Sequence, residues 1–405
     1  MKCEALFDRL GTAIREEWAL GNFDERRLPA IAERHLLEAR LSSAVSGEEI
    51  AEYALRSRHR VVTEADKNFG QPNINLYVDQ RFFIEALFWL EGTTAIHEHA
   101  FSGAFEVLQG GSVHSRFAFA ETERLNDGFR LGRLEQTQIE LLTRGDVRQI
   151  TSGDGFIHSL FHLEHPSVSI VVRTNGDPDA GVQFAYLSPS VKYNPFARTQ
   201  FQKLAARTLE MLRKSRSPAY EAQLVAYLRA CEVREAVEVL ANEALFADEA
   251  WLTRVVGQLD HTPYAPALPQ ITASLLDTVR MTQIKVLRSK VTDRELRLTL
   301  GILMNCRDRH SLFALLSRAF PQVEPEAKLV ESLHSLARVG IGFPEGDSSI
   351  DFVAPLLAGL TDEQLVESLK QSYGVEEVEQ ERGEILEACR LLRRHPLLVS
   401  ILCSG

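Results

Sequence analysis

The hydrophobic pattern of the chain changes its period twice. From about residue 70 to about residue 190, short runs rich in Phe, Val, Ile and Tyr are separated by turn residues such as Asn126, Asp127 and Gly128. Before and after this stretch, apolar residues recur every three or four positions, as they do in amphipathic helices. Many short strands at regular spacing predict an all-β sandwich or barrel. The expected fold class is therefore α+β, an antiparallel β domain with helices on both sides in sequence.

The length of 405 residues is more than one ordinary hydrophobic core accommodates. We expect an N-terminal helical segment over 1–62, a β domain over 63–195 and a large all-helical domain over 196–405. Ser46 predicts an N-cap, and the segments 292–295 and 361–364 predict capping boxes. No convincing internal repeat is present, and an array of helical hairpins is an alternative architecture for the helical domain.

Composition and charge narrow the functional classes. The net charge is −11, with both signs mixed along the chain and no long basic run, so we expect no nucleic-acid partner. The five cysteines are widely spaced without a CxxC pair, which is typical of free thiols in a reducing compartment. No apolar run has the length that crosses a membrane, and the N-terminus lacks a signal-peptide pattern. We therefore expect a cytoplasmic protein without a membrane partner.

Histidines concentrate in the predicted β domain. Six of the 12 fall there, at His97, His99, His114, His158, His162 and His165. Side chains alternate across a strand, so residues two or four apart, such as His97 and His99, share a face. A barrel with three of these imidazoles facing inward would bind one transition metal and leave positions open for other ligands. The alternative is that the pair at 97 and 99 arose by chance and is solvated.

The order of motifs around these histidines resembles the cupin superfamily. The segments are "GTTAIHEH", "GAFEVLQGG" and "GDGFIHSLFHLEHPSVSIVVRT". Within cupins, residues 73–190 are most similar to thiol dioxygenases of the cysteine dioxygenase type. The resemblance implies a jelly-roll barrel that binds Fe(II) through His97, His99 and His158 and acts on a small molecule and O2. Zn, Ni or Mn are alternative metals.

The chain departs from that family at its substrate-binding positions. Gly103 or Ala104 stands where the family often has a cross-linked cysteine. The family's Ser–His–Tyr relay corresponds to Ser169, Val171 and Arg173, so only the serine is kept. The upstream stretch "QPNINL" lacks the arginine that binds the substrate carboxylate. We therefore expect a mononuclear non-haem iron(II) dioxygenase-like oxidoreductase for a small amino, thiol or carboxylic acid other than free cysteine.

Further residues are candidates for the same site. Glu106 is either a fourth metal ligand or a solvent-facing glutamate, because a shift of one residue in register changes the face. His162 is an acid–base candidate, with packing or support of a ligand as the alternative. Arg173 either binds a substrate carboxylate or forms an ion pair at the barrel mouth. With Ser169, these two residues form the predicted catalytic set.

A second class of function stays open at this stage. The chain could be a non-catalytic or regulatory metal-binding cupin whose helical domain binds a partner protein. That helical domain could equally form a homo-oligomer interface or cover the barrel. The sequence contains no nucleophile elbow, phosphate-binding loop or dinucleotide-binding glycine motif, and none of its cysteines lies in the β domain.

Overall fold

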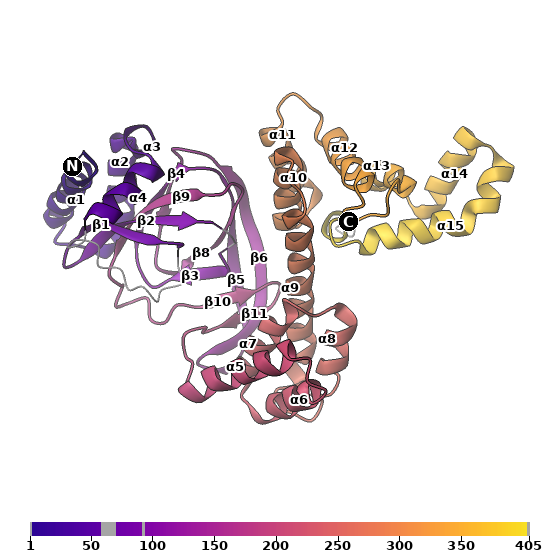
Figure 1. Ribbon diagram of the computed structural model, residues 1–405, viewed down its shortest axis with the longest axis horizontal. Coiled ribbons are helices and arrows are strands. Elements are labelled where there is room, and N and C mark those ends of the chain that lie inside the picture. The colour runs from indigo at the N-terminus through magenta and orange to yellow at the C-terminus, as the bar shows by residue number, and fades with distance from the viewer. Residues whose placement is uncertain (1, 58–69, 91–93, 403–405) are drawn as a thin grey trace. The chain divides into compact units, whose positions relative to one another are not determined.

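A computed structural model describes residues 2–57, 70–90 and 94–402 (Figure 1). The chain divides into two compact units, Met1–Gln138 with Leu142–Val279, and Ile139–Leu141 with Arg280–Gly405. The predicted α+β class, with an antiparallel β domain between helical segments, is confirmed. The predicted boundary between residues 62 and 63 lies outside the described residues.

Helices cover one face of a sheet in the first unit. The helix α4 begins at a capping box, in which Glu49 N donates to Ser46 Oγ and Ser46 N donates to the Glu49 carboxylate. Apolar side chains of these helices form one continuous core with the sheet below them. The elements are α1 (Lys2–Leu20), η1 (Glu25–Arg27), α2 (Leu28–Ala39), α3 (Leu41–Ala44) and α4 (Gly47–Arg56).

The covered sheet is antiparallel and has two different faces. Along β9, Val168, Ile170 and Val172 pack into the helical core, whereas the alternate residues of the strand line a cavity. One strand therefore contributes both to the core and to the cavity. The strand order is β1 (Asn73–Val78), β2 (Phe82–Trp89), β9 (Ser167–Thr174), β4 (Gly103–Gln109) and β7 (Val147–Ile150).

The remaining strands of the β domain close into a barrel. In the antiparallel pair of β3 and β8, His97 lies opposite His158, and the register shifts before His99. On the other face of β3, Glu98 accepts hydrogen bonds from the buried Tyr186 and Lys192 side chains. The barrel order is β10 (Ala185–Leu187), β11 (Val191–Tyr193), β6 (Phe129–Leu142), β5 (Ser112–Asn126), β8 (Gly153–His162) and β3 (Ile96–His99).

Helices that follow the barrel pack against it within the first unit. Their apolar core includes Phe129, Leu131 and Val191 from the barrel strands. The Ser274 hydroxyl donates to Leu187 O and accepts from Ser190 N, which attaches α9 to the strands. These elements are α5 (Gln200–Lys214), α6 (Tyr220–Ala230), α7 (Val233–Ala244), α8 (Glu249–Val256), η2 (Ala265–Ala267) and α9 (Leu268–Ser289), whose last residues belong to the second unit.

Apart from Ile139–Leu141 of β6, the second unit is built of helices. The capping box predicted at Thr361 is confirmed, whereas the one at Thr292 is wrong by one residue, because Asp293 is the N-cap and accepts from Leu296 N. Among the described residues, no helix is long and apolar enough to span a membrane. The helices are α10 (Arg294–Asn305), α11 (Arg309–Ala319), α12 (Pro325–Arg338), η3 (Ser348–Phe352), α13 (Val353–Leu357), α14 (Asp362–Tyr373), α15 (Val375–Arg394) and α16 (Val399–Leu402).

Candidate metal centre

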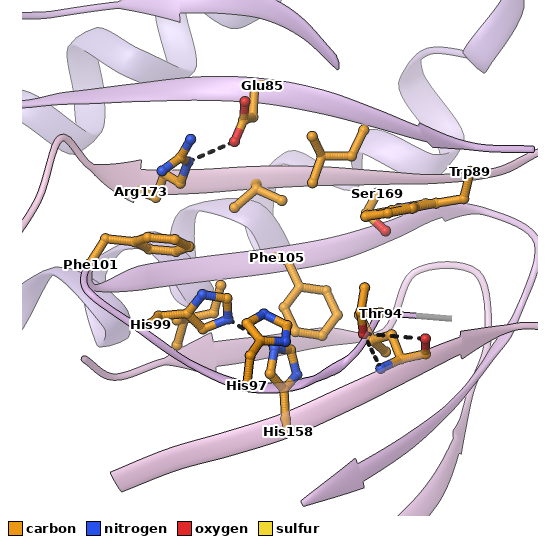
Figure 2. A pocket seen from close by; sticks show the side chains of 14 residues that line it. Glu85, Trp89, Thr94, His97, His99, Phe101, Phe105, His158, Ser169 and Arg173 are labelled. Atoms are coloured by element: carbon orange, nitrogen blue, oxygen red, sulfur yellow. Dashed lines mark hydrogen bonds and ion pairs between the residues drawn. The ribbon is translucent and has the colours of Figure 1, made fainter. Parts of the chain in front are cut away.

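Three histidines converge on one wall of the cavity (Figure 2). His97 and His99 lie on β3 and His158 on β8, and one ring nitrogen from each lies within 4.8 Å of the others. All three side chains are buried. The antiparallel pairing of β3 with β8 thus brings together residues that are about 60 positions apart in sequence. These are the three residues predicted as ligands.

Hydrogen bonds define which nitrogen of each ring points to the common centre. His97 Nδ1 lies 2.7 Å from Ala95 O, so it carries the proton and leaves the Nε2 lone pair for a ligand role. His158 Nδ1 lies 3.1 Å from His114 Nε2. If neutral His158 is to ligate through Nε2, its Nδ1 must donate this bond, and His114 must accept it.

The distance between the ring nitrogens of His99 and His158 can be compared with the distance between two ligands of one metal ion. His99 Nε2 and His158 Nε2 are 2.8 Å apart. Adjacent nitrogen ligands with metal–nitrogen bonds of about 2.1 Å stand roughly 3 Å apart, which is close to this spacing. The two atoms are therefore spaced as neighbouring ligands of one ion. The other ring nitrogen of His99, Nδ1, is buried and has no hydrogen-bond partner among the described residues.

Burial keeps the three imidazoles neutral. It lowers the pKa of His97, and it lowers the pKa of His99 and His158 well below the usual value, with further lowering by neighbouring histidines. The neutral ring is the form that offers a lone pair to a metal. Imidazole nitrogens bind Fe, Zn, Ni and Cu, so the donor set fits a transition metal without identifying which one.

The cavity is small and mainly apolar. Its volume is about 30 Å³, and it lies between the five-stranded sheet and the barrel. One water molecule needs about 10–15 Å³ by this measure, so the space admits only a few non-hydrogen atoms. Its apolar lining includes the side chains of Leu87, Trp89, Phe105, Ile150, Leu160 and Val171.

An ion pair occupies the wall opposite the histidines (Figure 2). Arg173 Nε donates to Glu85 Oε1 at 2.6 Å, and the Glu85 side chain is only 2% exposed. The guanidinium carbon lies 4.3 Å from the Phe83 ring centre and 4.6 Å from that of Phe101. Of the two predicted roles of Arg173, the ion pair is therefore present, and the rings and Glu85 hold the guanidinium in place.

The other predicted residues differ in where they lie. Ser169 lines the cavity. Glu106 lies on the opposite face of β4, where its carboxylate accepts from Ser42 N at 2.9 Å beneath the N-terminal helices. It is therefore not brought to the histidines, and since it is buried it is not solvent-facing either.

His162 shares a face with His158 but is not brought into the cavity. Four residues of strand separate their Cα atoms by about 13 Å. The His162 ring stacks on Trp89 with 4.6 Å between ring centres, and its Nδ1 lies 3.0 Å from Ser112 Oγ. Burial lowers the pKa of His162 to about 3, so it is neutral near pH 7.

Sequence reasoning missed two residues of this region, Glu85 and His114. A signal for Glu85 existed, because an acidic residue in the apolar run "FFIEALFW" is expected to be buried with a partner. For His114, its place on the strand beside β8 becomes visible only from the pairing of β5 with β8.

The chain was compared with family models, curated proteins and solved structures. No family model matches it, and no curated protein matches it. It is similar in part to a hydroquinone 1,2-dioxygenase, PnpCD, in complex with Cd2+ and 4-hydroxybenzonitrile, with 17% identity over 26% of this chain and 63% of that chain and a TM-score of 0.20. It is also similar to the capsular polysaccharide assembling protein CapF from Staphylococcus aureus, with 18% identity over 31% of this chain and 32% of that chain and a TM-score of 0.17. At these TM-scores neither likeness supports an argument about function.

The ligand assignment predicts a graded loss of metal affinity. His97→Ala, His99→Ala and His158→Ala should each abolish stoichiometric binding of Co(II) or Zn(II), because two nitrogens remain. His114→Phe should weaken binding about 10- to 100-fold, whereas His114→Gln, which can still accept from His158 Nδ1, should bind more tightly than His114→Phe. Titration calorimetry measures this, with the exposed His261→Ala as control. Full binding by the three ligand variants would show that the assignment is wrong.

The buried state of His162 predicts a pH dependence of stability. Its pKa is about 3 when folded and about 6.5 when unfolded, so between these values only the unfolded chain binds the proton. The free energy of unfolding should therefore fall below about pH 6.5, by roughly 1.4 kcal/mol per pH unit from this residue. In urea unfolding at about pH 7.5 and about pH 5.5, His162→Gln should reduce the difference by roughly 1.4 kcal/mol. An unchanged difference would mean that His162 titrates normally.

Proposed function

We propose that the chain is a cupin-type metalloenzyme, a mononuclear non-haem iron(II) dioxygenase-like oxidoreductase for a small amino, thiol or carboxylic acid. The observation that carries this proposal is the meeting of three buried, neutral histidines at a small, mainly apolar cavity. Three protein ligands leave positions open on an octahedral ion, as catalysis requires. The resemblance of the motif order to cupins supports the same assignment.

Iron(II) bound there would supply open coordination positions where a chelating substrate and O2 could react. The chain's own groups would do the rest. His97, His99 and His158 hold the ion, and the apolar walls exclude bulk water, which strengthens electrostatic interactions inside. The remaining N–H groups of Arg173 can donate to an anionic group of the substrate, since Glu85 and the two phenylalanine rings fix the guanidinium.

Free cysteine is not the substrate that this cavity favours. A Cβ on Gly103 would lie 1.9 Å from Val172 O, so no larger side chain fits at that position. Ala104 faces the helical core instead of the cavity. Val171, at the position of the family's histidine, lines the cavity without offering a polar atom. The cavity therefore has neither the cross-linked cysteine nor the complete Ser–His–Tyr relay of the family that the sequence resembles.

A second candidate function is a metal-binding cupin without catalysis, which acts as a regulatory or interaction module. The specific observation in its favour is the cavity volume of about 30 Å³, which leaves little room for a substrate beside an ion. In this case the helices would supply the binding surface for a partner protein. Metal binding is common to both candidates, whereas O2 consumption separates them.

We expect the purified protein to contain about one transition-metal ion per chain by elemental analysis without added metal. The iron-loaded protein should consume O2 with a member of a panel of amino, thiol and hydroxy acids that includes 3-mercaptopropionate, and free cysteine should give little uptake. Metal loading without O2 uptake for any member would favour the non-catalytic candidate. A chain that binds no metal would contradict both candidates.

With the active substrate identified, Arg173 can be tested without leaving a buried charge unpaired. The double variant Glu85→Gln with Arg173→Gln replaces the ion pair by neutral amides of similar size. We expect kcat/KM to fall about 10- to 100-fold, the effect of losing a charge-assisted hydrogen bond to the substrate. Arg133→Gln, at an exposed position on β6, is the matched control. Unchanged kcat/KM in the double variant would remove Arg173 from the substrate site.

A further inference from the structure

Helix α5 exposes an apolar stripe. Phe201, Leu204 and Met211 are 67%, 62% and 53% exposed. At positions i, i+3 and i+10 they lie on the same side of the helix, away from the buried Leu209. Phe196 and Phe246, 67% and 65% exposed, add apolar surface close to the two ends of α5, where Arg213 stacks on the Phe246 ring. Several large exposed apolar side chains on one side of a helix indicate an interaction site.

Positive charge runs along one edge of this stripe. Lys203 and Arg207 are exposed and four positions apart, so they lie on one side of α5. Arg207 is also three positions after Leu204 and four before Met211, which places it beside the stripe. Neither forms an ion pair with any residue that the structure describes. The helix "QFQKLAARTLEMLRK" carries four basic residues and one acidic residue, in a chain whose net charge is −11. We call Phe201, Lys203, Leu204, Arg207 and Met211 the basic face.

The second unit has a surface of opposite charge. Tyr373 and Val375, 66% and 62% exposed, flank Gly374 between α14 and α15. Along α15, Glu377, Glu381 and Glu384 follow at spacings of four and three, which places them on one side of the helix. None of these three forms an ion pair within the described part of the chain. Val375, the first residue of α15, lies on the other side of the helix from these glutamates. We call the surface at this end of α15, with Tyr373, Val375, Glu377, Glu381 and Glu384, the acidic face.

We propose that the basic face of one copy of this chain binds the acidic face of a second copy. Each face combines exposed apolar side chains with unpaired charges of one sign, and the two signs are opposite. A second copy would pair both faces, whereas an anionic membrane would bind only the basic face and leave the acidic face without a partner. The proposal does not depend on the metal site, so either can fail alone.

Charge reversal tests this contact in the full-length protein. One variant carries Lys203→Glu and Arg207→Glu, and the other carries Glu377→Lys and Glu381→Lys. Analytical ultracentrifugation at low salt should show self-association of the natural chain, weakened at least about tenfold in each variant because like charges then face each other. Equimolar mixing of the two variants should restore association, and so should all four substitutions in one chain. Lys290→Glu with Arg318→Glu, at exposed positions elsewhere, is the control for net charge.

The outcomes are decisive in either direction. A natural chain that stays monomeric at all concentrations would overturn the proposal. So would association that both reversals leave intact, or association that mixing does not restore. Binding of the basic face to anionic vesicles, or to an acidic peptide, by monomeric protein would assign the face to another occupant. Phe201→Ser with Leu204→Ser should weaken association without lowering the free energy of unfolding, because both side chains are exposed.

Discussion

The antiparallel pairing of β3 with β8 is the interaction on which the candidate site depends. It sets His97 directly opposite His158. The register then shifts, so that His99, two residues further along β3, lies opposite Gly153. On its other edge β3 pairs with β10, where Ala185 lies opposite His97. Behind the strand, Glu98 is held by Tyr186 and Lys192. The backbone that carries two of the candidate ligands is thus fixed from three directions.

Burial of polar groups in this cavity costs free energy that the surrounding contacts offset. A buried ionised carboxylate is tolerated when it is paired and hydrogen-bonded, as Glu85 is by Arg173. The histidines avoid a charge altogether, because burial lowers their pKa values. His99 Nδ1 is an exception, because this buried polar atom has no hydrogen-bond partner among the described residues. Such exceptions are typical of functional sites, where stability is given up for chemistry.

The sequence predicted the fold well because hydrophobic period is a local property. The change from a period near 3.6 to short alternating strands was enough for the α+β class, and the spacing of His97 and His99 was enough to place them on one face. Faces were harder to assign where the register was unknown. Glu106 occupies the helix-covered face of β4, and His162 has the correct face of β8 but lies too far along it. His114 could not be recognised because its role arises from a neighbouring strand, which no local pattern reveals.

Burial of the candidate ligands also affects how a metal would compete with protons. An exposed imidazole has a pKa near 6.5, so protonation would compete with the metal just below neutral pH. In this cavity the pKa values of His99 and His158 lie well below that range, which means that the lone pairs stay available in mildly acidic solution. The same packing that buries the three rings therefore disfavours their protonated, charged form. Because alternate residues of β9 belong to the helical core and to the cavity wall, the N-terminal helices contribute to this protection although none of their residues lines the cavity.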